Sequence, residues 1–135
     1  MTTTTMAMLD AYPGDTVLDK RLLTRCIETC LECGQACTAC ADADLGEQTV
    51  AHLVKCARLN LDCADMCQTT WRVLTRQTGY DRDLTRAVVQ ACAQTCRVCG
   101  DECEGHARMH EHCRVCAEVC RRCQQVCEEV LAAIG

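Results

Sequence analysis

The sequence predicts an all-α fold, an antiparallel up-down-up-down four-helix bundle with a cysteine-lined core. Seventeen cysteines among 135 residues recur at intervals of three and four in four separate runs, the spacing that returns side chains to one face of an α-helix. Only a few residues separate the helical segments, and such short connections place successive helices antiparallel. The bulky residues that usually fill a core are scarce, with no Phe, one Trp and two Tyr, so the cysteines themselves are expected to line the interior.

The first helix is expected over residues 16–44. Thr16 followed by Asp19 resembles a helix-opening pair. Pro13 and Gly14 end a preceding segment, residues 1–14, which we expect to be flexible, while residues 15–135 form one bundle domain. The cysteines of this helix lie within an arc of about 80°; they are Cys26, Cys30, Cys33, Cys37 and Cys40.

The second helix is expected over residues 47–78, after a break at Leu45 and Gly46 and before a stop at Gly79. Its cysteines occupy an arc of about 40°; they are Cys56, Cys63 and Cys67. His52 and Asn60 lie roughly 40° on either side of this row, so both side chains can point inward. Asn60 is a harder ligand than cysteine; it serves either as a weak metal ligand or as a hydrogen-bond partner of a thiolate or histidine.

The third helix is expected from an N-cap at Asp81 to about Gly105, and the fourth over residues 107–134. The cysteines of the third span an arc of about 60°; they are Cys92, Cys96, Cys99 and Cys103. Those of the fourth span about 80°; they are Cys113, Cys116, Cys120, Cys123 and Cys127. Burying four such faces together creates one interior lined with thiols.

The two ends of the predicted bundle differ in character. One end gathers apolar residues, namely Leu22, Leu23, Trp71, Leu74, Leu84, Val88, Val130, Leu131 and Ile134. The opposite end, which we call the histidine end, gathers His52, His106, His110 and His112 together with Met109. Met109 lies at the centre of the cysteine arc of its helix, His106 and His112 lie about 20° outside its edges, and His110 is well away from it. His110 is therefore the weakest ligand candidate.

Composition and charge exclude several classes of function. A net charge of −5 without a basic patch argues against a nucleic-acid partner. There is no signal-peptide pattern and no apolar run long enough to span a bilayer, so we expect a cytoplasmic protein, without a membrane partner, whose thiols stay reduced. An odd number of cysteines and the nearly parallel Cβ directions of helical neighbours also disfavour disulfides. No constellation of catalytic groups indicates an enzyme.

The most favoured use of such an interior is to bind Cu(I). Thiolates prefer the soft ions Cu(I) and Zn(II) and iron–sulfur clusters, and an uninterrupted helical row suits two- and three-coordinate ions along an axis better than a single wrapped centre. One Cu(I) per thiolate leaves the buried core nearly neutral. In contrast, one Zn(II) bound by four unshared thiolates leaves a net charge of −2 at each site. We expect about one Cu(I) per cysteine. A zinc reservoir and a thiol redox protein are the alternatives.

The chain resembles the cytosolic branch of the bacterial copper storage proteins. The resemblance rests on CxxxCxxCxxxCxxC from Cys26 to Cys40, CxxxCxxCxxxC from Cys92 to Cys103 and CxxCxxxCxxCxxxC from Cys113 to Cys127. It implies many Cu(I) ions per chain held by CxxxC pairs, with His or Met ligands near an open end, and assembly as a homotetramer. From the helical positions, the candidate ligands besides the cysteines are His106, His112, Met109, His52 and Asn60. We expect copper to enter at the histidine end and to pass to the deeper thiolates.

Overall fold

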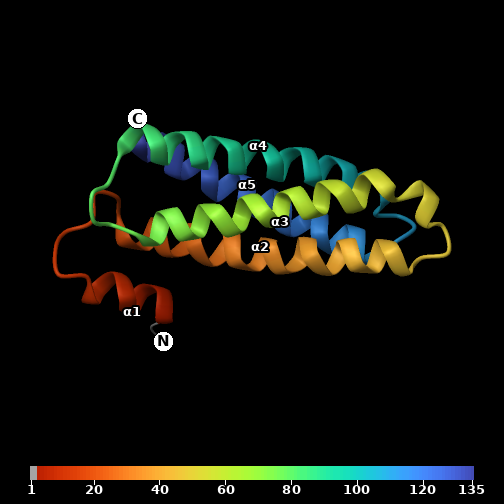
Figure 1. Ribbon diagram of the computed structural model, residues 1–135, viewed down its shortest axis with the longest axis horizontal. Coiled ribbons are helices and arrows are strands. Elements are labelled where there is room, and N and C mark those ends of the chain that lie inside the picture. The colour runs from red at the N-terminus through yellow and green to blue at the C-terminus, as the bar shows by residue number, and fades with distance from the viewer. Residues whose placement is uncertain (1–2) are drawn as a thin grey trace.

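Four long helices run antiparallel along one axis in the computed structural model, which describes residues 3–135 (Figure 1). They are α2 (Lys20–Gly46), α3 (Val54–Thr75), α4 (Arg82–His106) and α5 (Glu111–Ile134); a short helix, α1 (Thr4–Ala11), precedes them, and a 3-10 turn, η1 (Val50–His52), precedes α3. Both α2 and α4 pack against α3 and α5. The predicted all-α four-helix bundle is therefore confirmed.

Side-chain caps fix the starts of two of these helices. Asp19 accepts hydrogen bonds from the backbone amides of Arg21 and Leu22 at 2.9 and 3.0 Å, and Asp81 accepts one from the amide of Leu84 at 2.8 Å. These bonds satisfy amides that have no partner within the first turn of a helix. Asp81 was predicted as an N-cap, and that prediction is confirmed. Thr16 instead donates to the carbonyl of Leu18 before the helix begins.

Several predicted helix ends were wrong by a few residues. Residues 47–53 form a turn and η1 instead of the start of the second helix, and this segment is anchored by Leu53, which is 1 % exposed. The second helix stops at Thr75, before Gly79 with its φ of 70°. Residues 107–110 form a turn, so the last helix begins at Glu111 instead of residue 107. Helical periodicity continues through such turns in the sequence and does not mark them.

Helix α1 corrects the expectation of a flexible segment over residues 1–14. Thr3 caps this helix by accepting from the amide of Met6 at 3.2 Å, and Leu9 is buried at 3 % exposure. Thr24 of α2 donates to the Met6 sulfur at 3.7 Å. Burial of Leu9 compensates for the weak helix preference of the threonines. Residues 1 and 2 of the predicted flexible segment lie outside the described residues.

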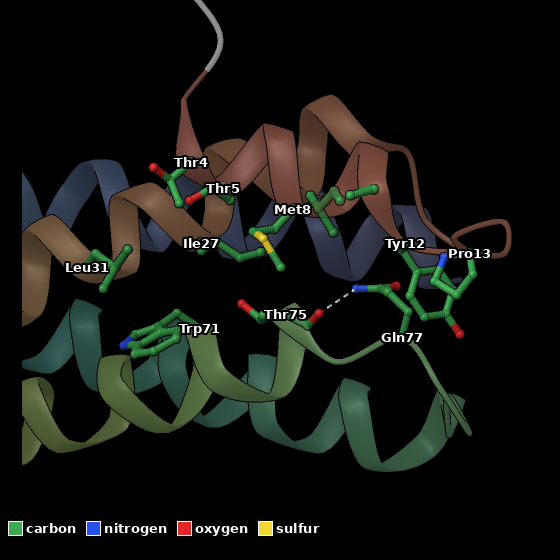
Figure 2. Close-up of a pocket in the computed structure, with 12 residues that line it drawn as sticks. Thr4, Thr5, Met8, Tyr12, Pro13, Ile27, Leu31, Trp71, Thr75 and Gln77 are labelled. Carbon is green, nitrogen blue, oxygen red and sulfur yellow. Dashed lines mark hydrogen bonds between the residues drawn. The ribbon is translucent and has the colours of Figure 1, made fainter.

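An apolar pocket lies between part of α1 and the bundle, at the end opposite the histidines (Figure 2). Its volume is about 390 Å³, and Met8 and Tyr12 face Ile27 and Trp71 across it. The pocket contains no cysteine among its lining residues. It is therefore separate from the thiol-lined interior.

Hydrocarbon closes the apolar end of the bundle, as predicted. Leu23, Leu74 and Val130 are each at most 3 % exposed. Two members of the predicted set differ: Val89 is buried in place of Val88, and Leu84 is 58 % exposed. Among the described residues, no helix has both the length and the apolar character needed to cross a bilayer.

Candidate metal centre

The cysteines of all four long helices point into the bundle and form what we call the thiol column, from Cys26 near the apolar end to Cys40 and Cys113 near the histidine end. All seventeen are free thiols, and each is at most 2 % exposed. The predicted inward orientation of every cysteine is thus confirmed. The protein has placed soft ligands where most bundles have leucine.

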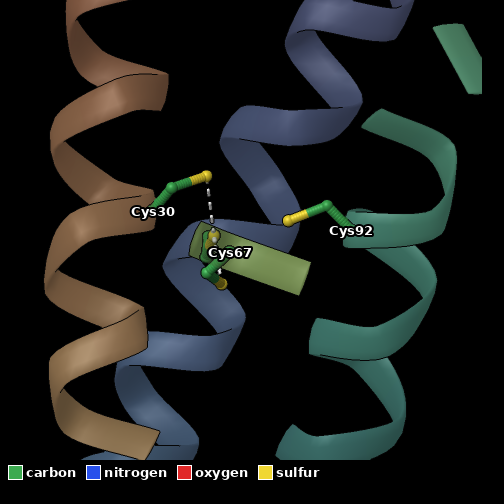
Figure 3. Close-up of side chains that lie close together, drawn as sticks. Cys30, Cys67 and Cys92 are labelled. Atoms are coloured by element: carbon green, nitrogen blue, oxygen red, sulfur yellow. Dashed lines mark hydrogen bonds between the residues drawn. The ribbon is translucent and has the colours of Figure 1, made fainter. Parts of the chain in front are cut away.

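Each level of the thiol column collects sulfurs from several helices. Cys30 of α2, Cys67 of α3 and Cys92 of α4 converge on the axis (Figure 3). Cys123 of α5 completes this group, and the four sulfurs lie within 4.8 Å of one another. The Cys123 sulfur is 3.8 Å from that of Cys30 and 4.0 Å from that of Cys67. A single ion at this level can reach ligands from all four helices.

Successive groups share their members. Cys67 belongs both to the group just described and to the next one, with Cys33, Cys63 and Cys96. Two further groups continue toward the histidine end; they are Cys33, Cys37, Cys63, Cys120 and Cys37, Cys99, Cys116, Cys120. A thiolate that belongs to two groups can bridge two ions. The column therefore suits a chain of linked metal ions better than a set of separate mononuclear sites.

The sulfur separations match those that metal coordination requires. Neighbouring sulfurs are 3.7 to 4.0 Å apart, as between Cys37 and Cys120 or between Cys33 and Cys63. With a metal–sulfur bond of about 2.3 Å, two sulfurs on one ion are about 3.8 Å apart in tetrahedral geometry and about 4.6 Å apart in linear geometry. Small side-chain movements therefore suffice to admit metal. The ligands are positioned before any ion binds.

At the histidine end of the column, the Cys113 thiol keeps its proton in the absence of metal. Burial raises the pKa of the Cys113 thiol, and the nearby Cys56 and Asp44 raise it further, because each of these disfavours the thiolate. A thiol must lose its proton to bind a metal ion, so loading of the column releases protons. The positive charge of each bound ion then replaces that of the lost proton.

A polar layer lies in the column next to its histidine end, formed by Asp44 and Asn60, both of which are 0 % exposed. Asn60 Oδ1 accepts hydrogen bonds from the thiols of Cys99, Cys103 and Cys116 at 3.1, 3.2 and 3.4 Å. The Asn60 amide nitrogen donates to Asp44 Oδ2 at 3.3 Å and to the Cys56 sulfur at 3.6 Å. Of the two roles predicted for Asn60, hydrogen bonding to sulfur is the one present in the metal-free protein.

His112 is the histidine that reaches the thiol column. Its Nδ1 lies 3.4 Å from the Cys40 sulfur and 3.6 Å from that of Cys113. Its Nε2 lies 3.0 Å from Glu47 Oε2, and this hydrogen bond lowers the pKa of the Glu47 carboxyl. A carboxylate on Nε2 holds the proton there and leaves the Nδ1 lone pair facing the sulfurs. His112 is therefore oriented as a ligand.

The remaining predicted ligands at this end lie farther out. His106 Nε2 is 2.9 Å from Glu102 Oε2, His52 is exposed and Met109 is 79 % exposed. In residues 3–135 none of these three makes a hydrogen bond to a thiol. His110, ranked last by the sequence, lies beside His112 with a ring-to-ring distance of 5.5 Å and also pairs with Glu47.

Two functional candidates, Asp44 and Glu47, were missed by the sequence analysis. Asp44 groups with Cys40, Cys56 and Cys113 within 4.8 Å. It follows Cys40 by four residues and so continues the cysteine row of α2 by one more step, which was an available signal. Glu47 caps the end of α2, and its pairing with His112 joins residues 65 positions apart. Nothing in the local pattern indicates that contact.

Comparison with known proteins places this site among copper-binding bundles. The family model described as copper storage protein matches residues 19–132. The chain is 59% identical to the copper storage protein Ccsp from Streptomyces lividans, solved loaded with 10 copper equivalents; the match covers 96% of this chain and 99% of that one with a TM-score of 0.95. A five-copper structure of the cytosolic protein from the same organism is 64% identical over 83% of this chain and 93% of that one, with a TM-score of 0.83.

A curated relative agrees with these structures in its cysteine content. The uncharacterized cysteine-rich protein YhjQ of Bacillus subtilis (strain 168) is 36% identical over 107 residues, which cover 79% of this chain and 94% of YhjQ. The family match spans all four long helices that form the thiol column. The chain therefore belongs to the copper storage protein family.

Proposed function

We propose that this protein stores Cu(I) in the thiol column at about one ion per cysteine. The observation that carries the proposal is the continuous set of buried free thiols in which adjacent groups share members such as Cys33, Cys37 and Cys67. Sharing allows each thiolate to bridge two monovalent ions, and equal numbers of Cu(I) and thiolate leave the interior nearly neutral. Neutrality matters because unbalanced buried charge costs several kcal/mol per ion.

The proposed ligands are the seventeen cysteines, with His112 and Asn60 as nitrogen and oxygen ligands in the outermost groups. His112 Nδ1 already faces two sulfurs, and Asn60 Oδ1 already faces three. His106, His52 and Met109 act at the surface of the histidine end, where they capture incoming copper before it reaches the column. Leu23, Leu74 and Val130 close the other end, so copper enters and leaves through the histidine end.

Neither alternative function fits the site as well. A zinc reservoir of tetrahedral sites with four unshared cysteines uses sixteen of the seventeen cysteines in four groups, whereas the groups here overlap. A thiol redox protein needs an exposed, activated cysteine. Every cysteine here is buried. We propose that the chain has no enzymatic activity.

The resemblance also supports a location and an assembly. One similar solved structure is described as a cytosolic copper storage protein, and we propose a cytoplasmic location for this chain. We also propose a homotetramer. Leu31 and Leu61 on the outer surfaces of α2 and α3 are 43 % and 48 % exposed, which is consistent with an apolar contact between bundles.

An anaerobic titration tests the storage proposal. The fully reduced protein is titrated with Cu(I) in the presence of a competing chelator, and the ions retained per chain are counted. We expect saturation near one Cu(I) per cysteine, and retention of only four or five ions would contradict the proposal. A parallel titration with Zn(II) provides the comparison: the zinc alternative requires saturation near four ions that Cu(I) displaces only slowly.

A further inference from the structure

The side-chain amide of Asn60 can be turned in two ways, and only one of them directs its oxygen toward sulfur. In the structure, Asn60 Oδ1 accepts from Cys99 and Cys103 at 3.1 and 3.2 Å. Its nitrogen faces the opposite side, toward Asp44 and Cys56. The two orientations have the same shape, so hydrogen bonding decides between them.

The sulfurs around Asn60 do not fix this choice by themselves. A thiol is both a weak donor and a weak acceptor, so it can donate to the amide oxygen or accept from the amide nitrogen. A thiolate formed on metal loading can only accept. Sulfur on both sides of the amide would therefore permit either orientation, and loading would favour the one that directs nitrogen into the column.

Asp44 favours one of the two orientations of the Asn60 amide. Its Oδ2 lies 3.3 Å from the Asn60 amide nitrogen, and its Oδ1 is reached by the Cys113 thiol at 3.7 Å and lies 3.6 Å from His112 Nδ1. Above about pH 8 the Asp44 carboxyl group is ionised, and a carboxylate oxygen accepts hydrogen bonds and cannot donate them, so it attracts the NH2 group and repels the amide oxygen. Both residues are 0 % exposed, so water does not compete for either partner.

We propose that Asp44 is a positioning residue that holds the Asn60 amide with its oxygen toward the thiols of Cys99, Cys103 and Cys116. Asp44 lies on α2 and Asn60 on α3, so this single hydrogen bond joins two helices at the polar layer. The proposal rests on the storage function proposed above, because it explains how an oxygen ligand remains available in the column. Asp44 thus acts on the thiols indirectly, by setting the orientation of Asn60.

The orientation can be read directly by NMR of the reduced, metal-free protein at about pH 8, where the Asp44 carboxyl group is ionised. In the wild type, the Asn60 NH2 protons are expected to give nuclear Overhauser effects to the β-protons of Asp44 and Cys56. In Asp44→Ala, we expect new effects to the β-protons of Cys99 and Cys103, because nothing then prevents the flipped orientation. Asp44→Asn can both accept and donate, so it no longer excludes the flipped orientation and is expected to give both sets of effects. Asp42→Ala removes the same charge from an exposed position of the same helix and serves as the control.

Copper retention provides the second measurement. In competition with a Cu(I) chelator, Asp44→Ala is expected to release its weakest-held ions at about tenfold lower chelator concentration than the wild type, with Asp42→Ala close to the wild type. In an Asn60→Ala background, Asp44→Ala should cause little additional loss, since the two residues act as a unit.

The outcomes separate this inference from the storage proposal. Wild-type contacts from the Asn60 NH2 group to Cys99 and Cys103, or an Asp44→Ala spectrum with the wild-type pattern, overturns the inference while copper storage stands. Full additivity of the two substitutions in the chelator assay overturns it as well. The wild-type spectrum decides the orientation even if Asp44→Ala does not fold. Failure of the wild type to retain copper at all overturns the storage proposal, independently of the NMR result.

Discussion

Glu47 Oε2 lies 3.0 Å from His112 Nε2, and this contact directs the opposite nitrogen of the ring toward the sulfurs of Cys40 and Cys113. Glu47 follows α2 and His112 lies in the first turn of α5, so the contact spans the opening of the bundle. It places a nitrogen ligand between solvent and the first thiols, at the point where an incoming ion must pass.

Replacement of His112 by Ala is expected to slow Cu(I) uptake at least several-fold while the final number of bound ions remains nearly unchanged. The reason is that the ring provides an intermediate ligand but few of the storage sites. Stopped-flow mixing of reduced protein with a Cu(I) complex measures the rate. Gln48→Ala is the matched control, since Gln48 is exposed in the turn at the same end of the bundle and has no role in copper capture. Equal rates for His112→Ala and the wild type would contradict the role given to His112.

Replacement of Cys33 by Ser is expected to lower copper capacity by at least one ion. Cys33 belongs to two groups of sulfurs, and a hydroxyl is a hard ligand that Cu(I) binds poorly. Anaerobic titration against a chelator counts the loss. Val89→Ala, which removes buried volume without removing sulfur, is expected to retain the wild-type count. A Cys33→Ser variant with undiminished capacity would show that this sulfur is not used.

Asp44 is expected to make the stability of the reduced, metal-free protein depend on pH. Burial is the main cause that raises the pKa of its carboxyl from 3.8 to about 7, and Cys56 adds to the effect. Between these values the folded protein keeps a proton that the unfolded chain has released, so the contribution is complete below about pH 4 and is lost as the pH rises through about 7. At about 1.4 kcal/mol per pKa unit, the whole shift corresponds to a loss on the order of 4 kcal/mol.

Asp44→Asn provides the comparison, because an amide does not titrate. The free energy of unfolding is measured in denaturant at several pH values for both proteins, under reducing and metal-free conditions. The difference between wild type and Asp44→Asn should change across the window from about pH 4 to pH 7, with the wild type losing stability relative to the variant. A difference that is constant over this window would mean that Asp44 titrates normally.

Leu23→Ala is expected to destabilise the metal-free protein by about 2 to 5 kcal/mol, as for other large-to-small core substitutions. Leu23 is 2 % exposed at the apolar end, away from the histidines. Thermal or denaturant unfolding measures the loss, and Leu22→Ala, at a partly buried neighbour, should cost less. Copper capacity should be unchanged in both variants. A lower capacity in Leu23→Ala would indicate that the apolar end takes part in storage.

The sequence predicted the interior more reliably than the ends of the helices. All seventeen cysteines point inward as their spacing indicated, because a repeat of three and four residues leaves only one helical face for them. The turn at residues 107–110 and the delayed start of α3 at Val54 were not predictable in this way, since the periodicity persists through them. The α1 helix depends on burial of Leu9 against the bundle, a tertiary effect that local preference does not contain.

The site shows the same division between local and long-range information. The position of Asp44, one helical step beyond Cys40, could have been found from the sequence, although a buried carboxylate among thiols is an uncommon choice. The sequence could not show that His112, and not His106, meets the sulfurs, because this depends on Glu47 and on the exact place where α5 begins. Contacts between residues distant in the sequence decide which of several equivalent histidines meets the sulfurs.

X-ray diffraction from crystals of the copper-loaded protein, recorded on both sides of the copper absorption edge, tests storage in the thiol column most directly. Anomalous density should then form a line of copper ions along the bundle axis between the sulfurs of α2, α3, α4 and α5, from Cys26 to Cys113. Copper confined to the histidine end or the outer surface, with the buried thiols unoccupied at saturation, would contradict it.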